Sequence, residues 1–146
     1  MPRREFFSFT TDDDSVTLNG YMVRPTDFDP TRRYPVIMTQ YSGPGSQEVL
    51  NSWRLDWEEY FAMQGFVIVC TDGRGTGGRG KSFTSIVYRQ IGHYETIDQL
   101  AAARYVSRQP WADPDAIGIW GWSYGGFEAL LAMSQPNSTY AAGVAV

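Results

Sequence analysis

One serine stands where a catalytic nucleophile would be expected. Ser123 lies in the sequence Gly-Trp-Ser-Tyr-Gly-Gly, after the apolar run Ala116–Trp120 and before residues 127–133, which fit a helix. A G-x-S-x-G pattern between a strand and a helix is typical of a nucleophile elbow, in which a tight turn presents the serine hydroxyl at the edge of a sheet. Glycines on both sides avoid collisions across that turn. The pattern predicts acyl transfer through Ser123; the alternative is a plain strand-to-helix turn.

A serine hydroxyl needs a general base to take its proton as it attacks. In α/β-hydrolases the order along the chain is Ser, then Asp or Glu, then His. The only histidine, His93, precedes Ser123, and the only acid after Ser123 is Glu128, inside the expected helix. We therefore expect His93 to be a helix-entry residue at the surface. The triad Asp and His are expected beyond Val146, which would leave the isolated chain inactive.

The oxyanion of an acyl-transfer intermediate needs hydrogen-bond donors that are already in place. The backbone N–H of Tyr124, directly after the serine, is the first candidate. The second donor normally comes from the loop after the third strand, and this loop begins at Tyr41. The tyrosine hydroxyl is able to donate there, although a tyrosine at a strand end is more often a packing residue.

The rest of the chain supplies elements that would position these residues. A hairpin is expected from segments 6–10, 15–18 and 18–23, with the acidic turn Asp12–Asp14 between the first two. Apolar runs predict strands at 36–41, 66–70, 116–120 and 141–146. Two amphipathic helices are expected, one from Trp53, Trp57, Tyr60 and Phe61 and ending near Gly65, the other from Ile97, Leu100, Ala101 and Tyr105. This order predicts an α/β fold with helices on both faces of a mostly parallel sheet.

Composition sets outer limits on the kind of protein. The chain has 146 residues, 42% of them hydrophobic and 19% charged, which fits one globular domain. A net charge of −4 argues against nucleic acid as a partner. The single cysteine, Cys70, excludes an internal disulfide and fits a buried strand position. No signal peptide or membrane span is recognisable, and the residues themselves assign no compartment.

A glycine-rich loop suggests a different function, which is nucleotide binding. Gly73, Gly75 and Gly78 match G-x-G-x-x-G after an apolar strand, and Glu95 follows about 20 residues later, as in a dinucleotide-binding fingerprint. That fingerprint needs a helix at the third glycine, whereas helical character here begins only near Tyr94. The neighbouring arginines are compatible with RNA binding. Because the net charge is negative, a solvated loop explains them better.

Three motifs in the same order resemble one family. YSGPGSQ at 41–47, TDGRGTGGRG at 71–80 and WADPDAIGIWGWSYGG at 111–126 are similar to the catalytic domain of the dipeptidyl peptidase IV branch of the prolyl oligopeptidase family of serine peptidases. The resemblance runs from about Tyr34 to the end. It implies that Ser123 is the nucleophile and that the Tyr41 hydroxyl and the Tyr124 N–H bind the oxyanion. It also implies that Tyr124 lines the pocket for proline or alanine at the penultimate position of a peptide substrate.

The resemblance further implies that residues 1–146 are the N-terminal part of an α/β-hydrolase peptidase catalytic domain, with about six of its eight strands. A β-propeller would precede this part in the parent protein. No cofactor or metal is implied, and an exported parent, whether periplasmic, secreted or membrane-anchored, is compatible. An unpaired strand at 141–146 predicts self-association, hence a homo-oligomer. Two alternatives stay open: another α/β-hydrolase, such as an esterase or acylaminoacyl peptidase, and a non-catalytic binding or scaffold chain.

Overall fold

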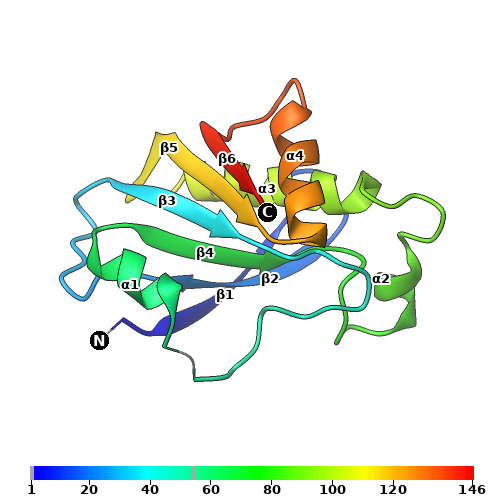
Figure 1. The fold of residues 1–146 in the computed structure, drawn as a ribbon, viewed down its shortest axis with the longest axis horizontal. Coiled ribbons are helices and arrows are strands. Elements are labelled where there is room, and N and C mark those ends of the chain that lie inside the picture. The colour runs from blue at the N-terminus through cyan, green and yellow to red at the C-terminus, as the bar shows by residue number, and fades with distance from the viewer. Residues whose placement is uncertain (1, 54) are drawn as a thin grey trace.

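A twisted sheet of six strands, in the order β1-β2-β4-β3-β5-β6, organises the molecule (Figure 1). The computed structural model describes residues 2–53 and 55–146. The strands are β1 (Arg4–Thr10), β2 (Thr17–Val23), β3 (Tyr34–Thr39), β4 (Val67–Asp72), β5 (Ala112–Gly121) and β6 (Ala142–Ala145). Strands β4, β3, β5 and β6 are parallel, and the antiparallel β1–β2 hairpin extends the sheet beyond β4. The carboxyl ends of the parallel strands therefore meet at one edge, where ligands bind in open α/β sheets.

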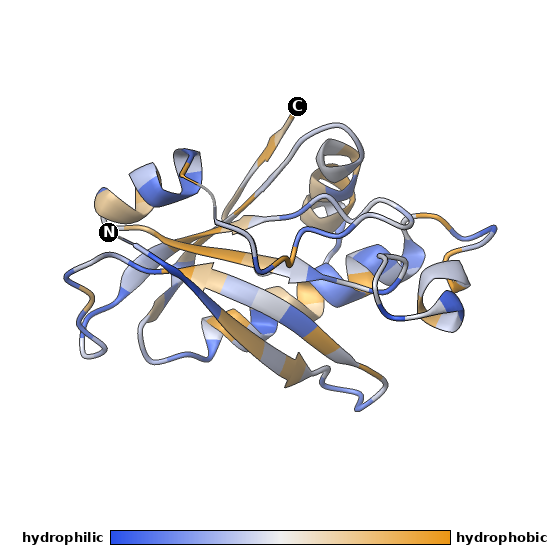
Figure 2. Ribbon diagram, turned by 90° about the horizontal axis from the view of Figure 1, so that it is seen from below, coloured by the Kyte–Doolittle hydropathy of each residue, from blue (hydrophilic) through white to orange (hydrophobic). Residues whose placement is uncertain are grey.

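Helices cover both faces of this sheet, as the sequence predicts. They are α1 (Trp57–Met63), α2 (Lys81–Ser85), α3 (His93–Ser107) and α4 (Tyr124–Ser134). Strand β4 is buried along its whole length, and its side chains alternate between two cores. Val67 and Val69 face α3 and α4, whereas Ile68 and Cys70 face α1. Figure 2 shows how the apolar residues concentrate in the strands.

The N-terminal hairpin differs from its expected outline. Residues 17–23 of the two expected segments form one continuous strand, β2, which pairs with β1 along its whole length. Gly20 lies inside that strand, with the ring of Phe7 over it, and so marks no turn. The acidic turn is where the sequence places it: Asp12 pairs with Arg104 and Arg108, and Asp13 accepts a hydrogen bond from Thr11.

Two helix predictions were wrong in detail. Helix α1 begins at Trp57, capped by Asp56, so Trp53 lies outside it. Its buried residues are Glu58, Glu59 and Ala62 rather than the aromatic face. Helix α3 is buried around most of its circumference, because the sheet and α4 both cover it, and it shows no amphipathic stripe.

The sequence did not predict one short helix or the first residues of one strand. The five-residue helix α2 was not expected at all. Strand β5 begins at Ala112, earlier than the expected strand at 116–120, and its pairing with β3 shifts register there. Strand β6 forms the edge of the sheet and is exposed, as expected for 141–146. Within the described residues, no helix is long and apolar enough to cross a membrane.

Candidate active site

The turn from β5 to α4 holds Ser123 in an uncommon backbone conformation. Its φ of 56° and ψ of −114° lie in a region that residues with a side chain rarely adopt. Such conformations cost on the order of 1–3 kcal/mol and cluster at functional sites. The side chain of Ser123 is exposed at the carboxyl edge of the sheet. The strand, turn and helix predicted around this serine are all present.

The glycines of the turn are required by close approaches of the backbone. A Cβ on Gly121 would collide with the carbonyl oxygen of Gly125. A Cβ on Gly125 would lie 2.5 Å from the carbonyl oxygen of Gln40. The first contact allows the sharp turn, and the second lets the start of α4 approach the end of β3. The backbone of the elbow therefore packs directly against the loop after β3.

The backbone N–H of Tyr124, next to Ser123, has no acceptor among the described residues. The Ser123 N–H donates to the carbonyl of Val146 at 2.6 Å, and the Ser123 carbonyl accepts from the Phe127 N–H at 3.1 Å. Tyr124 is the first residue of α4, where N–H groups have no acceptor within the helix. The Tyr124 N–H also donates to no described residue outside the helix. This geometry suits it to bind an anion formed beside Ser123.

Tyr41 lies against the elbow, as its place after β3 predicts. Its ring centroid is 6.1 Å from that of Tyr124, with the two planes tilted by 46°. The ring is half-buried, and its hydroxyl bonds to no other described residue. The following residue, Ser42, has a φ of 62°, so the chain turns sharply directly after Tyr41. The structure thus brings Ser123, Tyr124 and Tyr41 together at one edge.

A buried polar network fixes the loop that carries Tyr41. The Gln40 side-chain amide donates to the Gly125 carbonyl at 2.7 Å, and the Ser42 hydroxyl donates to Gln40 Oε1 at 2.8 Å. Gln99 on α3 donates to the Ser42 hydroxyl at 3.2 Å and to the Thr71 carbonyl at 3.0 Å. All these side chains are buried, so the network joins the ends of β3 and β4 to the elbow and α3.

The hydroxyl of Tyr124 forms a hydrogen bond on the face of the sheet that α3 covers. It donates to Glu95 Oε1 at 2.8 Å, and Glu95 Oε2 accepts from the Gly92 N–H at 3.1 Å. Burial, together with the hydrogen bond to Glu95, raises the pKa of Tyr124 above its usual value. The phenol therefore stays protonated and directed at Glu95, which leaves the backbone N–H of Tyr124 as its donor toward Ser123.

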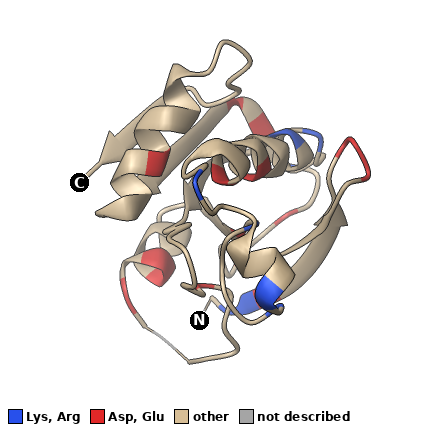
Figure 3. Cartoon of the chain, turned by 90° about the vertical axis from the view of Figure 1, so that its right-hand side faces the viewer, with Lys and Arg blue, Asp and Glu red and all other residues tan. Residues whose placement is uncertain are grey.

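A second carboxyl group, Glu128, is enclosed beneath the elbow. Its side chain is fully buried, Oε2 accepts from the Thr96 hydroxyl at 3.3 Å, and Oε1 has no described partner. Burial, helped by the nearby Glu95 and Asp98, raises the pKa of Glu128 to about 8. Figure 3 shows the acidic residues on the neighbouring helices α3 and α4. The raised pKa favours the neutral carboxylic acid at neutral pH.

His93 does not act on Ser123 in this structure. It is the first residue of α3, its side chain is exposed, and its ring packs edge-on against Tyr94. No hydrogen bond between His93 and Ser123 is found in the described part of the chain. The prediction of a surface histidine at a helix entry is confirmed.

The glycine-rich loop is occupied by contacts within the protein. Gly75 N–H donates to Phe83, Gly77 N–H donates to Ser46, and Arg74 forms an ion pair with Asp98 at 2.6 Å. The helix after the third glycine, α2, starts only at Lys81 and is five residues long. The loop therefore supports α3 and the loop after β3, and it lacks the helix N-terminus of a dinucleotide site.

Sequence reasoning missed the residues that hold this site in place. Gln40, Gln99, Glu95 and Glu128 are buried polar side chains whose partners come from distant segments. Polar residues at a strand end or on a helix usually face solvent, so their types carried no signal. Only the tertiary contacts identify them.

The matches to known proteins agree with one another. A model of the prolyl oligopeptidase family matches residues 53–146. The chain is 40% identical to a probable dipeptidyl-aminopeptidase B of Emericella nidulans over 148 aligned residues, covering all of this chain and 16% of that protein. It is 42% identical to the protein of the same name from Arthroderma gypseum over 139 residues, covering 90% of this chain and 15% of that protein.

Solved structures give the same result for the fold. The crystal structure of Porphyromonas gingivalis dipeptidyl peptidase 4 matches with a TM-score of 0.94 and 47% identity, over 99% of this chain and 20% of that one. Pyrococcus horikoshii acylaminoacyl peptidase matches with a TM-score of 0.82 and 25% identity, over 99% and 23%. These neighbours have the α/β-hydrolase fold, which confirms the fold class expected from the sequence. The chain spans about a sixth to a quarter of the length of these four proteins.

Proposed function

Because the chain belongs to the prolyl oligopeptidase family, we propose that it is the nucleophile-bearing part of a serine-type dipeptidyl peptidase. Residues 1–146 would form the N-terminal part of the catalytic domain. The whole protein would release dipeptides with proline or alanine at the penultimate position from the amino terminus of peptides. The observation that carries this proposal is the strained Ser123 beside the open N–H of Tyr124 and the ring of Tyr41.

The proposed reaction is acyl transfer in two steps. Ser123 Oγ attacks the carbonyl carbon of the second residue, and a histidine from the rest of the protein takes the hydroxyl proton. The oxyanion accepts hydrogen bonds from the Tyr124 N–H and the Tyr41 hydroxyl. The C–N bond breaks, the amine leaves with the proton from the histidine, and the dipeptide remains as an ester on Ser123. Water, deprotonated by the same histidine, then hydrolyses the ester.

The first test uses the full-length protein and chromogenic Ala-Pro and Gly-Pro anilides. We expect hydrolysis that Ser123→Ala lowers by about 10⁴-fold or more, because the acyl-enzyme can no longer form. Tyr41→Phe removes one oxyanion donor and is expected to lower kcat by about 10²–10³-fold with a smaller change in KM. Tyr88→Phe, at an exposed tyrosine, is the matched control and should leave both constants unchanged.

Two further measurements separate this proposal from its alternatives. An acetyl-alanine anilide should be a poor substrate for a dipeptidyl peptidase and a good one for an acylaminoacyl peptidase, whereas an esterase should prefer an acetate ester. The 146-residue chain alone should show no turnover, since its only histidine lies away from Ser123. Hydrolysis that survives Ser123→Ala would refute the proposed role of this serine.

A further inference from the structure

A small hollow of about 230 Å³ opens next to the nucleophile. Tyr41 and Trp122 form its boundary with the site, and Trp122 directly precedes Ser123. Trp57 and Trp120 form an aromatic wall, with ring centroids 5.1 Å apart. The hollow therefore lies beside the turn that carries Ser123.

The hollow and Tyr124 lie on different sides of the sheet edge. Trp120 packs on Trp57 of α1, whereas the Tyr124 hydroxyl is held by Glu95 of α3 on the other face. Tyr41 stands between them, since it lines the hollow and also contacts the ring of Tyr124. Under the proposed function, Tyr124 lines the pocket for the residue that becomes the acyl group. The hollow is then left for the residue on the other side of the scissile bond.

Two carboxylates give the hollow a negative character. Glu48 lines it, and its carboxylate accepts no hydrogen bond from a described residue. Asp56 also lines it, and its side chain caps α1 by accepting from the Glu58 N–H at 3.1 Å and from the Glu59 N–H. Glu58 itself is already occupied by Arg4 and Tyr21. The described lining residues include no lysine or arginine.

We propose that this hollow receives the side chain of the residue that follows the scissile bond, and that it favours lysine or arginine there. The carboxylates of Glu48 and Asp56 would attract the cationic head. The faces of Trp120 and Trp122 would contact its aliphatic stem and add cation–π attraction. The inference rests on the proposed function, because it names the leaving-group residue of the same reaction.

The test in the full-length protein compares Ala-Pro-Xaa amides in which Xaa is lysine, norleucine or glutamate. Lysine and norleucine share the same aliphatic stem and differ in the charged amine. We expect kcat/KM to favour lysine over norleucine by about fivefold at low salt, the size of a partly exposed ion pair. Glu48→Gln and Asp56→Asn should each lower that ratio toward one, and Glu48→Lys should favour the glutamate substrate. Asp115→Asn, which removes an exposed carboxylate from the opposite end of β5, should leave the ratio unchanged.

A binding measurement on the 146-residue chain gives a readout that needs no catalysis. N-acetyl-lysinamide should shift the indole N–H signals of Trp120 and Trp122 in NMR spectra more than N-acetyl-norleucinamide does, and Glu48→Gln should reduce the difference. Hydrolysis with equal rates for lysine and norleucine would overturn this inference and leave the proposed function standing. Absence of hydrolysis together with a lysine-dependent shift would overturn the proposed function, and with it the assignment to a leaving group.

Discussion

Beneath Ser123, a carboxyl group without a counter-charge changes how stability depends on pH. Glu128 is fully buried, and its pKa is raised to about 8 chiefly because burial disfavours the charged form. The unfolded chain holds this group at its ordinary pKa, near 4.3. The folded state therefore binds the extra proton between about pH 4 and pH 8. The contribution of protonated Glu128 to the free energy of unfolding is complete below about pH 4 and is lost as pH rises to about 8.

The corresponding variant is Glu128→Gln, which keeps the shape of the side chain and cannot ionise. We expect it to raise the free energy of unfolding by about 4–5 kcal/mol at pH 8 relative to the original chain, and to change it little at pH 4. Urea unfolding at the two pH values measures this difference. The exposed control Asp115→Asn should show no such pH-dependent gain. An equal effect of Glu128→Gln at both pH values would show that Glu128 does not titrate in this window.

At the scale of elements, the loop after β4 is fastened to α3 by one buried ion pair. Arg74 Nε and Nη2 donate to the Asp98 carboxylate, and the Arg74 backbone N–H donates to the same group at 2.6 Å. The Asp98 side chain has no solvent exposure, and the guanidinium lies over the ring of Tyr94 at 4.5 Å. The same helix carries Glu95 and Gln99, which hold Tyr124 and the Tyr41 loop. Loss of the pair would thus reach the site through α3.

We expect Arg74→Ala to lower the free energy of unfolding by about 3–5 kcal/mol, because it leaves the Asp98 carboxylate buried without its partner. Arg74→Lys should recover only part of the loss, since an ammonium does not reproduce the two-pronged guanidinium contact. Denaturant unfolding measures both, with Lys81→Ala at an exposed position as the control. A change below about 1 kcal/mol for Arg74→Ala would mean that the pair is not needed to hold α3.

The elements most readily predicted from sequence were those with strong local signals. The unbroken apolar run of β4 and the glycine pattern around Ser123 each specify one local structure, and both were correct. The aromatic spacing of Trp53 and Trp57 suggested a helix face, yet these rings lie at the surface and around hollows rather than in the core. Helix α3 was found, but its buried acids could not be, since their partners Arg74 and Tyr124 come from remote segments. The parts of the site formed by residues close together in the sequence could be predicted. The parts that need contacts between distant segments could not.

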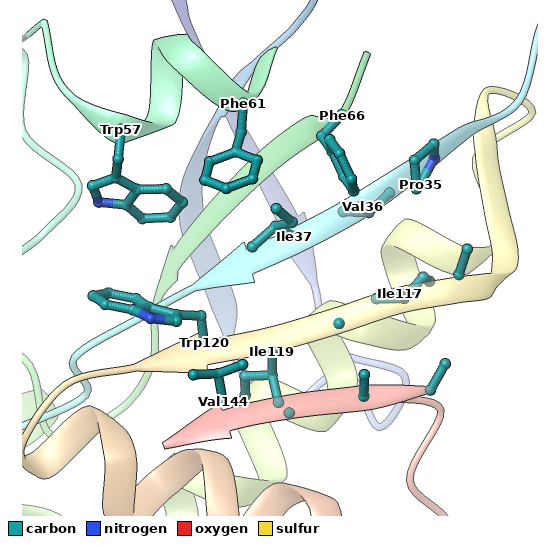
Figure 4. Close-up of a pocket in the computed structure, with 15 residues that line it drawn as sticks. Pro35, Val36, Ile37, Trp57, Phe61, Phe66, Ile117, Ile119, Trp120 and Val144 are labelled. Carbon is teal, nitrogen blue, oxygen red and sulfur yellow. The ribbon is translucent and has the colours of Figure 1, made fainter. Parts of the chain in front are cut away.

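On the scale of the whole molecule, one face of the sheet is incompletely covered. A groove of about 580 Å³ runs over β3, β5 and β6 beside α1, and its lining is almost entirely apolar (Figure 4). Phe61, Phe66 and Ile37 lie along one side, and Val144 of β6 along the other. Strand β6 is at the edge of the sheet with its backbone open to pairing. Exposed apolar surface beside an open strand edge favours association.

We expect the 146-residue chain to self-associate as its concentration rises, through this groove and the β6 edge. Val144→Glu places a charge in the groove and should shift the equilibrium toward monomer. Leu130→Glu adds the same charge on an exposed position of α4 outside the groove and serves as the control. Sedimentation velocity across a concentration series measures the effect. A monomer throughout that series for the original chain would contradict the prediction.

The hydrogen bonds between β6 and the elbow have a consequence for exchange with solvent. The Ser123 N–H donates to the Val146 carbonyl, and the Val146 N–H donates to the Gly121 carbonyl at 3.1 Å. The amide proton of Ser123 is therefore shielded only while the chain after β6 stays paired, although the side chain of the same residue is exposed to water. Each opening of that pairing would expose the Ser123 amide to exchange with water. The protection of this single amide thus reports how long the chain after β6 stays paired with the turn that carries Ser123.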